Sequence, residues 1–585
     1  MIYINKLSYL LLLIIFFGCN QVNSNRSIKK LDSLIHSYQD HNGYDREKYP
    51  LGLFTREYYK SEADFAQEKL EELSEINLDV LPETDKISAE LLKFVLEDKI
   101  AYYEFERFLN PLLSDSGFHI NLGFMVKSLQ NYNSVKDYLK KLSAIPDYVD
   151  QYFVNLREGL DKGVSQPKII FKGYESTYET HIVDDFQESY FYSPLKKLPE
   201  SLTSSQKDSV LTEGKIVIEN IVIPQFKRIK NFFETEYLPN TRTTIGVSDT
   251  PNGKAFYQNR INFYTTNNEF SPEDIHQIGL NEVKRIKAEM ENIIDELGFK
   301  GSFSDFLKFL RTDKQFYAKT PDELLMIARD IAKRADEQLP KFFKTLPRKP
   351  YGVAPVPDAI APKYTGGRYV GTSKNSSEPG YYWVNTYDLP SRTLYTLPSL
   401  TVHEAVPGHH LQGALNNELG DSIPKFRRNL YLSAYGEGWG LYAEFLADEM
   451  GMYTTPYEHF GKLTYEMWRA CRLVVDTGIH SKGWTRKQAV DFIASNTALS
   501  LHEVNTETDR YISWPGQALS YKIGELKIRE LRKKAKERLG SKFDIREFHE
   551  VILEQGTVTL SILEQRINSY MTFKTNNGKS YIIIS

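Results

Sequence analysis

The residues with the clearest potential for chemistry lie between positions 403 and 410. Three of the twelve histidines fall in this short stretch, where His403 and Glu404 are followed by His409 and His410. A metal-dependent hydrolase needs neutral imidazoles that converge on one ion, and a carboxylate beside them that accepts a proton from water. The familiar H-E-x-x-H motif meets this need by placing both imidazoles on one helical face. Here Pro407 stands where the second histidine of that motif would be.

The spacing of the histidines does not suit a straight helix. His409 would lie about 240° around the helix axis from His403, and His410 would share its face but lie about 10 Å further along. Pro407 removes a backbone hydrogen bond, so we expect a bulge or kink at this point. If the residues around Pro407 loop out, His409 takes the place of the second ligand. We therefore predict His403 and His409 as metal ligands, with Glu404 as the general base. His410 remains the alternative to His409.

Two carboxylates further along the chain could complete the site. Glu437 and Glu444 are seven residues apart, so they share one face of a helix. The glycines on either side of Glu437 lower the helix propensity by about 1 kcal/mol each, which suggests close helix packing or open space around this carboxylate. We predict Glu437 as the third metal ligand and Glu444 as a residue that orients a ligand imidazole. A solvated acidic helix face is the alternative for this pair.

Several other polar side chains are weaker candidates. His480 could donate a hydrogen bond to an oxyanion, or it could be a capping or packed histidine. Arg510 and Lys522 could bind a peptide carboxylate, although a solvated basic face fits each of them as well. A β-like run before the metal-binding segment carries three candidates for substrate binding, with structural packing as their alternative: Tyr381, Tyr382 and Asn385.

In these motifs the chain resembles an exported bacterial family that is known by its domain of unknown function 885. The resemblance rests on His403-Glu404-x-x-Pro407-Gly408-His409-His410, followed by Glu437-Gly438-Trp439. It covers most of the mature chain and extends through further matching positions: Arg469, Arg472, Asp476 to His480, Arg510-Tyr511 and Pro515 to Lys522. This family is grouped with the helical zinc peptidases, which include thimet oligopeptidase and angiotensin-converting enzyme.

The resemblance to helical zinc peptidases implies roles for further residues. Tyr521 resembles the tyrosines that polarise the scissile carbonyl in those enzymes, since a phenol can stabilise developing negative charge. A core tyrosine is the alternative. Those peptidases often pair an extended substrate with a strand edge, which is the role implied for Tyr381, Tyr382 and Asn385. Dipeptidyl peptidase III, in the wider group, has one extra residue between its ligand histidines, whereas this sequence has two.

The N-terminus predicts export. Lys6 is followed by a mostly apolar run from Leu7 to Phe17, too short to span a bilayer, and then by Gly18-Cys19. This end resembles a bacterial lipobox, so we predict a signal peptide over 1–18 and a lipidated Cys19 with a tether over 19–27. Ordinary secretion is the alternative. The lipid would anchor the protein in the cell envelope, at the outer membrane, on its periplasmic or surface face.

Composition predicts a large folded protein. The chain has 585 residues with 38 Tyr and 33 Phe, far too many aromatic residues for a disordered chain. Its 73 basic and 77 acidic residues argue against a nucleic-acid binder, which usually carries a basic face. Besides Cys19 there is only Cys471, so no internal disulfide is expected, and its apolar helical surroundings are typical of a buried thiol.

The pattern along the chain predicts a mainly α fold. We expect an N-terminal helical region over 28–245 and a catalytic helical region over 246–585, with a small sheet edge beside the metal-binding helix and a central cleft. Ser271 and Thr320 each precede a proline and acidic residues, which predicts two helix starts. The first of these helices is expected to end at Leu297. Three segments read as strands or turns: Gly246 to Thr266, Arg368 to Thr372, and Tyr381 to Tyr387.

These features predict a lipid-anchored zinc metallopeptidase that acts on short peptides. Zn²⁺ would leave a fourth position open for water, from which Glu404 takes a proton. One alternative is a non-catalytic lipoprotein that binds peptide or metal, although a simple metal trap does not need Glu404. The other is a zinc amidohydrolase that acts on a non-peptide amide. A peptide substrate and, through its lipid, the membrane are the expected partners, and the oligomeric state stays open.

Overall fold

The computed structural model describes residues 24–358, 361, 364–373 and 376–577. The chain is mainly helical with one small sheet, which confirms the predicted fold class. Residues 24–40 are helical, so this helix includes the last residues of the expected tether. The expected signal peptide, Cys19 and the rest of the tether lie outside the described residues. In the described part, no helix has an apolar stretch long enough to cross a bilayer.

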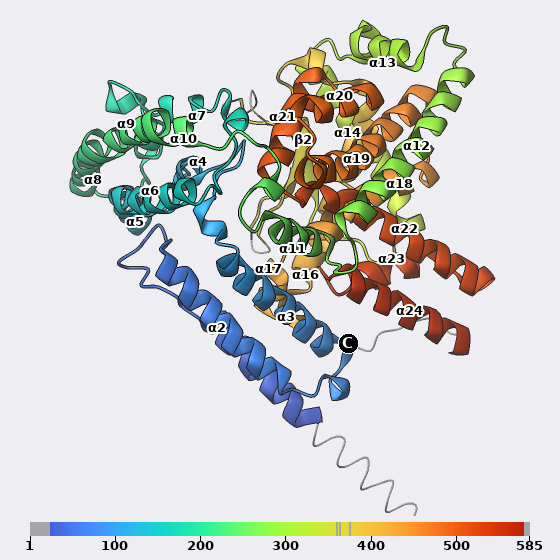
Figure 1. Cartoon of the computed structure of the whole chain (residues 1–585), viewed down its shortest axis with the longest axis horizontal. Coiled ribbons are helices and arrows are strands. Elements are labelled where there is room, and N and C mark those ends of the chain that lie inside the picture. Colours follow the sequence, from blue (N-terminus) through green and yellow to red (C-terminus); the bar gives the residue numbers. More distant parts are fainter. Residues whose placement is uncertain (1–23, 359–360, 362–363, 374–375, 578–585) are drawn as a thin grey trace, which may run out of the picture.

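Two long helices form an N-terminal arm, and a lobe of shorter helices follows it. Helices α2 (Arg56–Ser74) and α3 (Glu83–Glu104) run side by side along the lower part of the molecule in Figure 1. The lobe surrounds an aromatic core in which Phe118 stacks on Tyr152, and Phe153 stacks on Phe232. Its helices are α4 (Phe118–Asn121), α5 (Tyr132–Ser143), α6 (Ile145–Asp161), α7 (Ser176–Glu179), α8 (Ser204–Val217), α9 (Ile223–Asn231) and α10 (Leu238–Asn240).

A larger helical body follows the lobe. Two long helices of this body, α12 and α19, pack along each other. Before the sheet the body has α11 (Gly253–Thr265), α12 (Pro272–Glu296), α13 (Phe303–Thr312) and α14 (Pro321–Phe342). After the sheet come α15 (Leu397–Glu404), α16 (His409–Glu418), α17 (Lys425–Asn429), α18 (Ser433–Glu449), α19 (Pro456–Lys482), α20 (Arg486–Asn496), α21 (Leu501–Ser513), α22 (Ser520–Leu539), α23 (Ile545–Leu553) and α24 (Leu560–Asn577).

The helix starts expected from capping patterns are confirmed. The Ser271 hydroxyl accepts from the amide of Asp274, whose carboxylate accepts from the amide of Ser271. Helix α12 then ends just before Gly298, which has a φ of 64°. Thr320 caps α14 in a similar way by accepting from the amide of Glu323. Each capping side chain satisfies a backbone amide at the start of its helix. This is why the short polar patterns at Ser271 and Thr320 predicted the helix starts correctly.

The predicted strand and turn between Gly246 and Thr266 is wrong, since α11 occupies most of this segment. Tyr257, Ile261 and Tyr264 recur at helical spacing and are buried. The segment reads as alternating because α11 lies inside the body, against α18 and α22, and therefore carries apolar residues on more than one face.

The sheet has three strands in the order β1-β3-β2. Strands β2 (Gly367–Val370) and β3 (Gly380–Val384) match the two predicted β-like runs, although both are shorter than expected, and they pair antiparallel. Strand β1 (Tyr351–Pro355) lies outside the segments predicted as strands, and it pairs parallel with β3. The run that begins at Tyr381 was expected at the edge of the sheet, but β3 is the central strand. The free edge beside α15 is β2.

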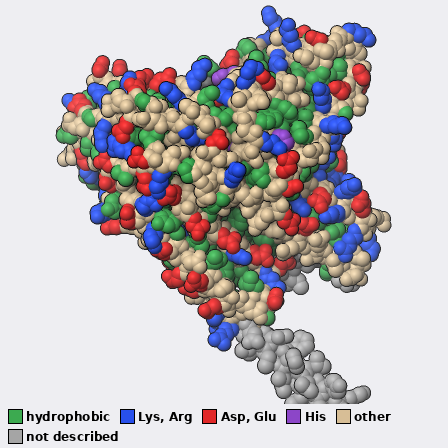
Figure 2. Space-filling view, in the orientation of Figure 1, with side chains coloured by type: hydrophobic (Ala, Val, Ile, Leu, Met, Phe, Trp, Pro, Cys, Tyr) green, Lys and Arg blue, Asp and Glu red, His purple; other side chains and the backbone are tan. Residues whose placement is uncertain are grey.

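Two large clusters of buried apolar side chains form the core. One extends from the lobe to α19 and α21, and the other surrounds α14, α15, α18 and the C-terminal helices. Cys471 lies fully buried in the first cluster, as expected, and burial raises the pKa of its thiol well above its usual range. The division of the chain into two helical regions at residue 245 stays a prediction. On the face shown in Figure 2, acidic and basic side chains are intermixed with apolar ones rather than gathered by sign.

Glycines allow α18 and α22 to approach closely. A Cβ atom added at Gly438 would lie 2.6 Å from the Cα of Gly524, and one added at Gly524 would lie 2.0 Å from the carbonyl oxygen of Ala434. No side chain fits between backbones at this separation. The contact holds the segment of α18 that carries Glu437 and Glu444.

Gly524→Ala should therefore lower the free energy of unfolding, by about 1–3 kcal/mol, because the added methyl group overpacks the interface between α18 and α22. Gly413→Ala is a matched control within helix α16, where the new Cβ would meet a ring carbon of Tyr369 at an ordinary 3.6 Å. Thermal and denaturant unfolding of both variants measures the effect. Equal stability of the two variants would contradict the close packing described here.

Candidate metal centre

A break between two helices brings His403 and His409 together. Helix α15 ends at Glu404 and α16 begins at His409, so the kink expected at Pro407 is a complete interruption. The amide of Gly408 donates to the carbonyl of Val402 at 2.9 Å. The two imidazole rings meet edge to face, with centroids 4.7 Å apart and planes at 87°. The two residues that looked surplus in the sequence are accommodated in the turn.

Three residues of α18 shape the space around this turn. The indole of Trp439 donates to the carbonyl of Pro407 at 2.8 Å and thereby ties the turn to α18. A Cβ atom at Gly440 would lie 2.6 Å from the imidazole of His403, so only glycine leaves room for that ring. The same helix presents Glu437 to both imidazoles. Sequence analysis did not identify the role of Gly440, because its spacing carries no signal of its own.

The carboxylate of Glu437 completes a set of converging ligand atoms. Its Oε2 lies 3.6 Å from Nε2 of His403 and 3.4 Å from Nε2 of His409. A tetrahedral zinc ion with bonds of about 2.0–2.1 Å separates its ligand atoms by about 3.3 Å. Both distances from Glu437 are close to the separation that such an ion requires. Glu404 also lies here, since its ligand atom and those of the two histidines are all within 4.8 Å of one another.

The electrostatics of these groups favour a cation. Burial would lower the pKa of His403, but Glu437 and Glu444 outweigh it and raise this pKa to about 9. Burial would raise the pKa of Glu437, but His409 and His403 hold it well below its usual range. Carboxylates in a buried site thus create a negative field at the point where the two imidazoles meet.

Glu444 holds the imidazole of His403 from the other side. Its Oε1 lies 2.7 Å from Nδ1 of His403, so Nδ1–H donates to the carboxylate and Nε2 is left to face Glu437. Arg469 lies 3.3 Å from the same oxygen. Both Glu444 and Arg469 are buried. This is the orienting geometry expected for Glu444 from the sequence.

Glu404 lies between the imidazoles and the sheet edge. Its Oε2 accepts a hydrogen bond at 2.8 Å from the backbone amide of Tyr369 in β2. Because backbone groups alternate in direction along a strand, this amide points away from β3 and towards the site. The free edge of β2 therefore runs directly past Glu404.

One tyrosine contacts Glu437, and a second lies near the first. The Tyr431 hydroxyl donates to Oε1 of Glu437 at 2.8 Å, although this side chain is 57% exposed overall. Tyr521 is close enough to Tyr431 to interact with it electrostatically, and its ring lies 4.1 Å from the guanidinium of Arg472. Sequence analysis missed Tyr431, which precedes α18 by two residues and shares no helical spacing with Glu437.

His410 points to a different environment. Its Nδ1 lies 3.2 Å from the hydroxyl of Tyr369, and its ring packs beside Tyr351. The side chain is buried, and burial lowers its pKa to about 4. The geometry therefore brings His409, rather than His410, to the side chains of His403 and Glu437.

Two predicted site residues belong to the core instead. His480 is fully buried, its Nδ1 accepts from the amide of Val247, and its Nε2–H donates to the carbonyl of Tyr511. With both ring nitrogens engaged, it cannot serve an oxyanion. Lys522 is also fully buried, and its ammonium forms ion pairs with the carboxylates of Glu282, Glu466 and Glu525. Because its charge is matched in this way, it cannot bind a substrate carboxylate.

The candidates on β3 are mostly structural. Tyr382 is fully buried, with its hydroxyl near Thr401. Asn385 is also fully buried, and its amide donates to the carbonyls of Ala361, Tyr364 and Thr365. Neither side chain is free to bind substrate, because its polar group is used within the fold. Tyr381 is partly exposed on the central strand and donates to Glu378.

Arg510 is used within the fold as well. Its guanidinium donates to the carboxylate of Glu507 at 2.8 Å and to the side-chain carbonyl of Gln517 at 2.8 Å. Glu507 and Tyr521 act electrostatically to raise its pKa despite burial. Arg510 therefore lies near Tyr521, but its charge is already matched by a carboxylate.

Two solved structures are similar to this chain along most of its length. The chain is similar to a crystal structure described as a "putative lipoprotein" from Colwellia psychrerythraea, with a TM-score of 0.84 and 28% identity over 94% of this chain and 98% of that one. A structure described as a "putative lipoprotein of unknown function" from Shewanella oneidensis has the same fold, with a TM-score of 0.67 and 19% identity over 93% and 98% of the two chains. These descriptions agree with the expected exported lipoprotein.

The search of curated proteins finds no match. A family model described as "Bacterial protein of unknown function (DUF885)" matches residues 38–567. This span includes the helical arm, the lobe, the sheet and the cluster around His403. The chain therefore belongs to the DUF885 family of bacterial proteins.

Proposed function

We propose that this protein is a lipid-anchored zinc peptidase that hydrolyses short peptides. The observation that carries this proposal is the convergence of His403, His409 and Glu437 at the spacing of a tetrahedral ion, with Glu404 beside them. Two imidazoles and one carboxylate are a typical ligand set of catalytic zinc, and they leave one position open. The resemblance of the motifs to helical zinc peptidases supports the same activity.

The ligand set suits zinc better than a hard cation. Imidazole nitrogen is a preferred ligand of Zn²⁺, whereas Ca²⁺ and Mg²⁺ take oxygen ligands. Glu444 fixes the tautomer of His403 so that Nε2 is available to an ion. Zinc in this position would supply Lewis-acid chemistry, polarising a substrate carbonyl and lowering the pKa of water.

Glu404 has the position of a general base. It accepts a proton from the attacking water and then passes it to the leaving amine. The amide of Tyr369 holds its carboxylate in place. An extended peptide that pairs with the free edge of β2 would bring its carbonyl to this carboxylate, because strand addition aligns backbone with backbone.

Tyr431 and Tyr521 are the proposed donors to the oxyanion. His480 is buried in the core, whereas Tyr431 contacts Glu437 and Tyr521 lies near Tyr431. A phenol placed beside the reacting carbonyl stabilises the charge that develops on its oxygen. Tyr431 has the exposed position needed to turn towards a substrate.

The ligand assignment predicts different metal contents for two neighbouring variants. His409→Ala should lose zinc, because it removes one of three protein ligands, whereas His410→Ala should keep about one zinc ion per chain. Elemental analysis after dialysis, with calorimetric titration of zinc, measures both. Loss of zinc from His410→Ala but not from His409→Ala would overturn the assignment.

The role of Glu404 predicts loss of cleavage without loss of metal. Glu404→Gln should lower kcat by about 10²–10⁴-fold while zinc content is unchanged, because the amide cannot accept the proton. Exposed Glu378→Gln is the matched control and should cleave normally. A mixed peptide library, read by mass spectrometry, gives the rates. Cleavage by Glu404→Gln at the wild-type rate would refute the mechanism, and wild-type protein that cleaves no peptide would refute peptidase activity.

The oxyanion role predicts a kinetic signature for the two tyrosines. Removing the hydroxyl that contacts the oxyanion should lower kcat by about 10²-fold and leave KM almost unchanged, since the interaction forms only in the transition state. Tyr431→Phe and Tyr521→Phe, measured on one cleaved peptide, show which hydroxyl has this role. If both variants keep the wild-type kcat, neither phenol stabilises the transition state.

A further inference from the structure

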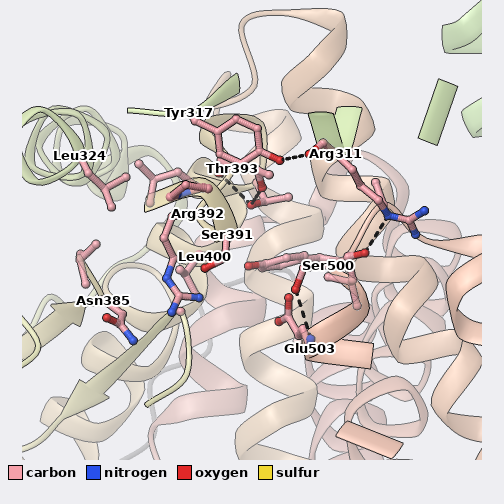
Figure 3. A pocket seen from close by; sticks show the side chains of 18 of the residues that line it. Arg311, Tyr317, Leu324, Asn385, Ser391, Arg392, Thr393, Leu400, Ser500 and Glu503 are labelled. Carbon is pink, nitrogen blue, oxygen red and sulfur yellow. Dashed lines mark hydrogen bonds between the residues drawn. The ribbon is translucent and has the colours of Figure 1, made fainter. Parts of the chain in front are cut away.

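A cavity of about 240 Å³ lies in the body of the protein beside α15 (Figure 3). Its walls come from the end of β3, the loop around Arg392, α14, the start of α15, α19 and the start of α21. The volume exceeds that of cavities which hold one benzene molecule, about 150 Å³, so it can receive one amino-acid side chain.

The cavity lies next to the candidate metal centre. Leu400 lines it and precedes Glu404 by four residues of α15, about 6 Å along the helix. Gly366 also lines it and is three residues before Tyr369, about 10 Å along an extended strand. A peptide that follows the edge of β2 past Glu404 therefore reaches the cavity within a few residues.

Arg392 is the cation that this cavity offers to a ligand. Figure 3 shows its side chain extending into the cavity towards Asn385, with Glu503 on the other side. Its Nε is buried without a hydrogen-bond partner among the described residues. Arg311 also lines the cavity, but its guanidinium donates to backbone carbonyls. A buried Nε–H donor without a partner is unfavourable unless an acceptor meets it.

Glu503 does not neutralise Arg392 fully. Burial and the nearby Glu507 raise the pKa of Glu503 to about 7, although Arg392, Arg469 and Arg472 act in the opposite direction. A carboxyl with a raised pKa takes up a proton more readily than usual and can then donate a hydrogen bond. Four leucines form an apolar part of the wall that suits an aliphatic stem: Leu324, Leu397, Leu400 and Leu499.

We propose that this cavity is a substrate subsite in which Arg392 binds a carboxylate carried on a short aliphatic stem. This inference rests on the proposed peptidase function and narrows its substrates to peptides that carry a carboxylate close to the cleaved bond. The carboxylate could come from an acidic side chain or from the C-terminus of the peptide. In both cases the guanidinium and the carboxylate form charge-assisted hydrogen bonds.

Binding of small probes tests the subsite independently of cleavage. The probes are N-acetylglutamate α-amide, N-acetylglutamine and N-acetylglutamine amide, which carry a side-chain carboxylate, a terminal carboxylate and no carboxylate, respectively. Calorimetry is carried out on metal-free protein, so that the carboxylate of a probe cannot bind to a metal ion. We expect at least one charged probe to bind about tenfold or more tightly than the neutral amide, a difference of about 1.4 kcal/mol.

Variants connect that preference to the cavity. Arg392→Gln should remove the preference, Arg392→Lys should retain part of it, and exposed Arg348→Gln should leave it unchanged. Unfolding curves confirm that each variant is folded. Equal binding of all three probes, no binding at millimolar concentrations, or a preference that survives Arg392→Gln would overturn the subsite.

The outcomes also separate this inference from the proposed function. Peptide cleavage that depends neither on an acidic side chain nor on a free C-terminal carboxylate would refute the subsite alone. Binding that depends on Arg392 in a protein that cleaves no peptide would support the carboxylate site and refute peptidase activity.

Discussion

The candidate site depends on one constraint, which is the approach of the Glu437 carboxylate to two imidazoles that belong to different helices. Burying carboxylates is unfavourable unless a cation or hydrogen-bond donors satisfy them. Here the donors and the negative field converge on one point between His403, His409 and Glu437. The elements around the site hold these three side chains close together.

Much of that support comes from α18. Within four residues this helix provides the carboxylate of Glu437, the close approach to α22 at Gly438, the hydrogen bond from Trp439 to the turn, and the space at Gly440 for the ring of His403. One turn further on, Glu444 orients the same imidazole. Packing therefore requires Gly438, Trp439 and Gly440 at their positions as specifically as the proposed chemistry requires the two glutamates.

The sequence predicted most of the elements that position the site, because their signals are local. Capping at Ser271 and Thr320 located helix starts, and the interruption at Pro407 indicated His409 over His410. Contacts between distant segments were not accessible in this way. The positions of Tyr431 and Tyr369 beside the glutamates depend on how α18 and β2 meet α15, and no spacing rule encodes that.

The errors have the same origin. His480 and Lys522 carry the chemistry of site residues, but tertiary packing places both inside the core with their polar groups satisfied. Asn385 was expected at a strand edge, yet the order of the strands makes β3 central. The segment of α11 alternated in hydrophobicity because a helix buried on several faces loses its usual pattern.

The most direct measurement is the X-ray absorption spectrum of the zinc-loaded protein. We expect a first shell of nitrogen and oxygen at about 2.0–2.1 Å with the scattering pattern of two imidazoles. The His409→Ala protein should lose the signal of one imidazole or bind no zinc. A shell without imidazole, or one unchanged by His409→Ala, would contradict the central claim.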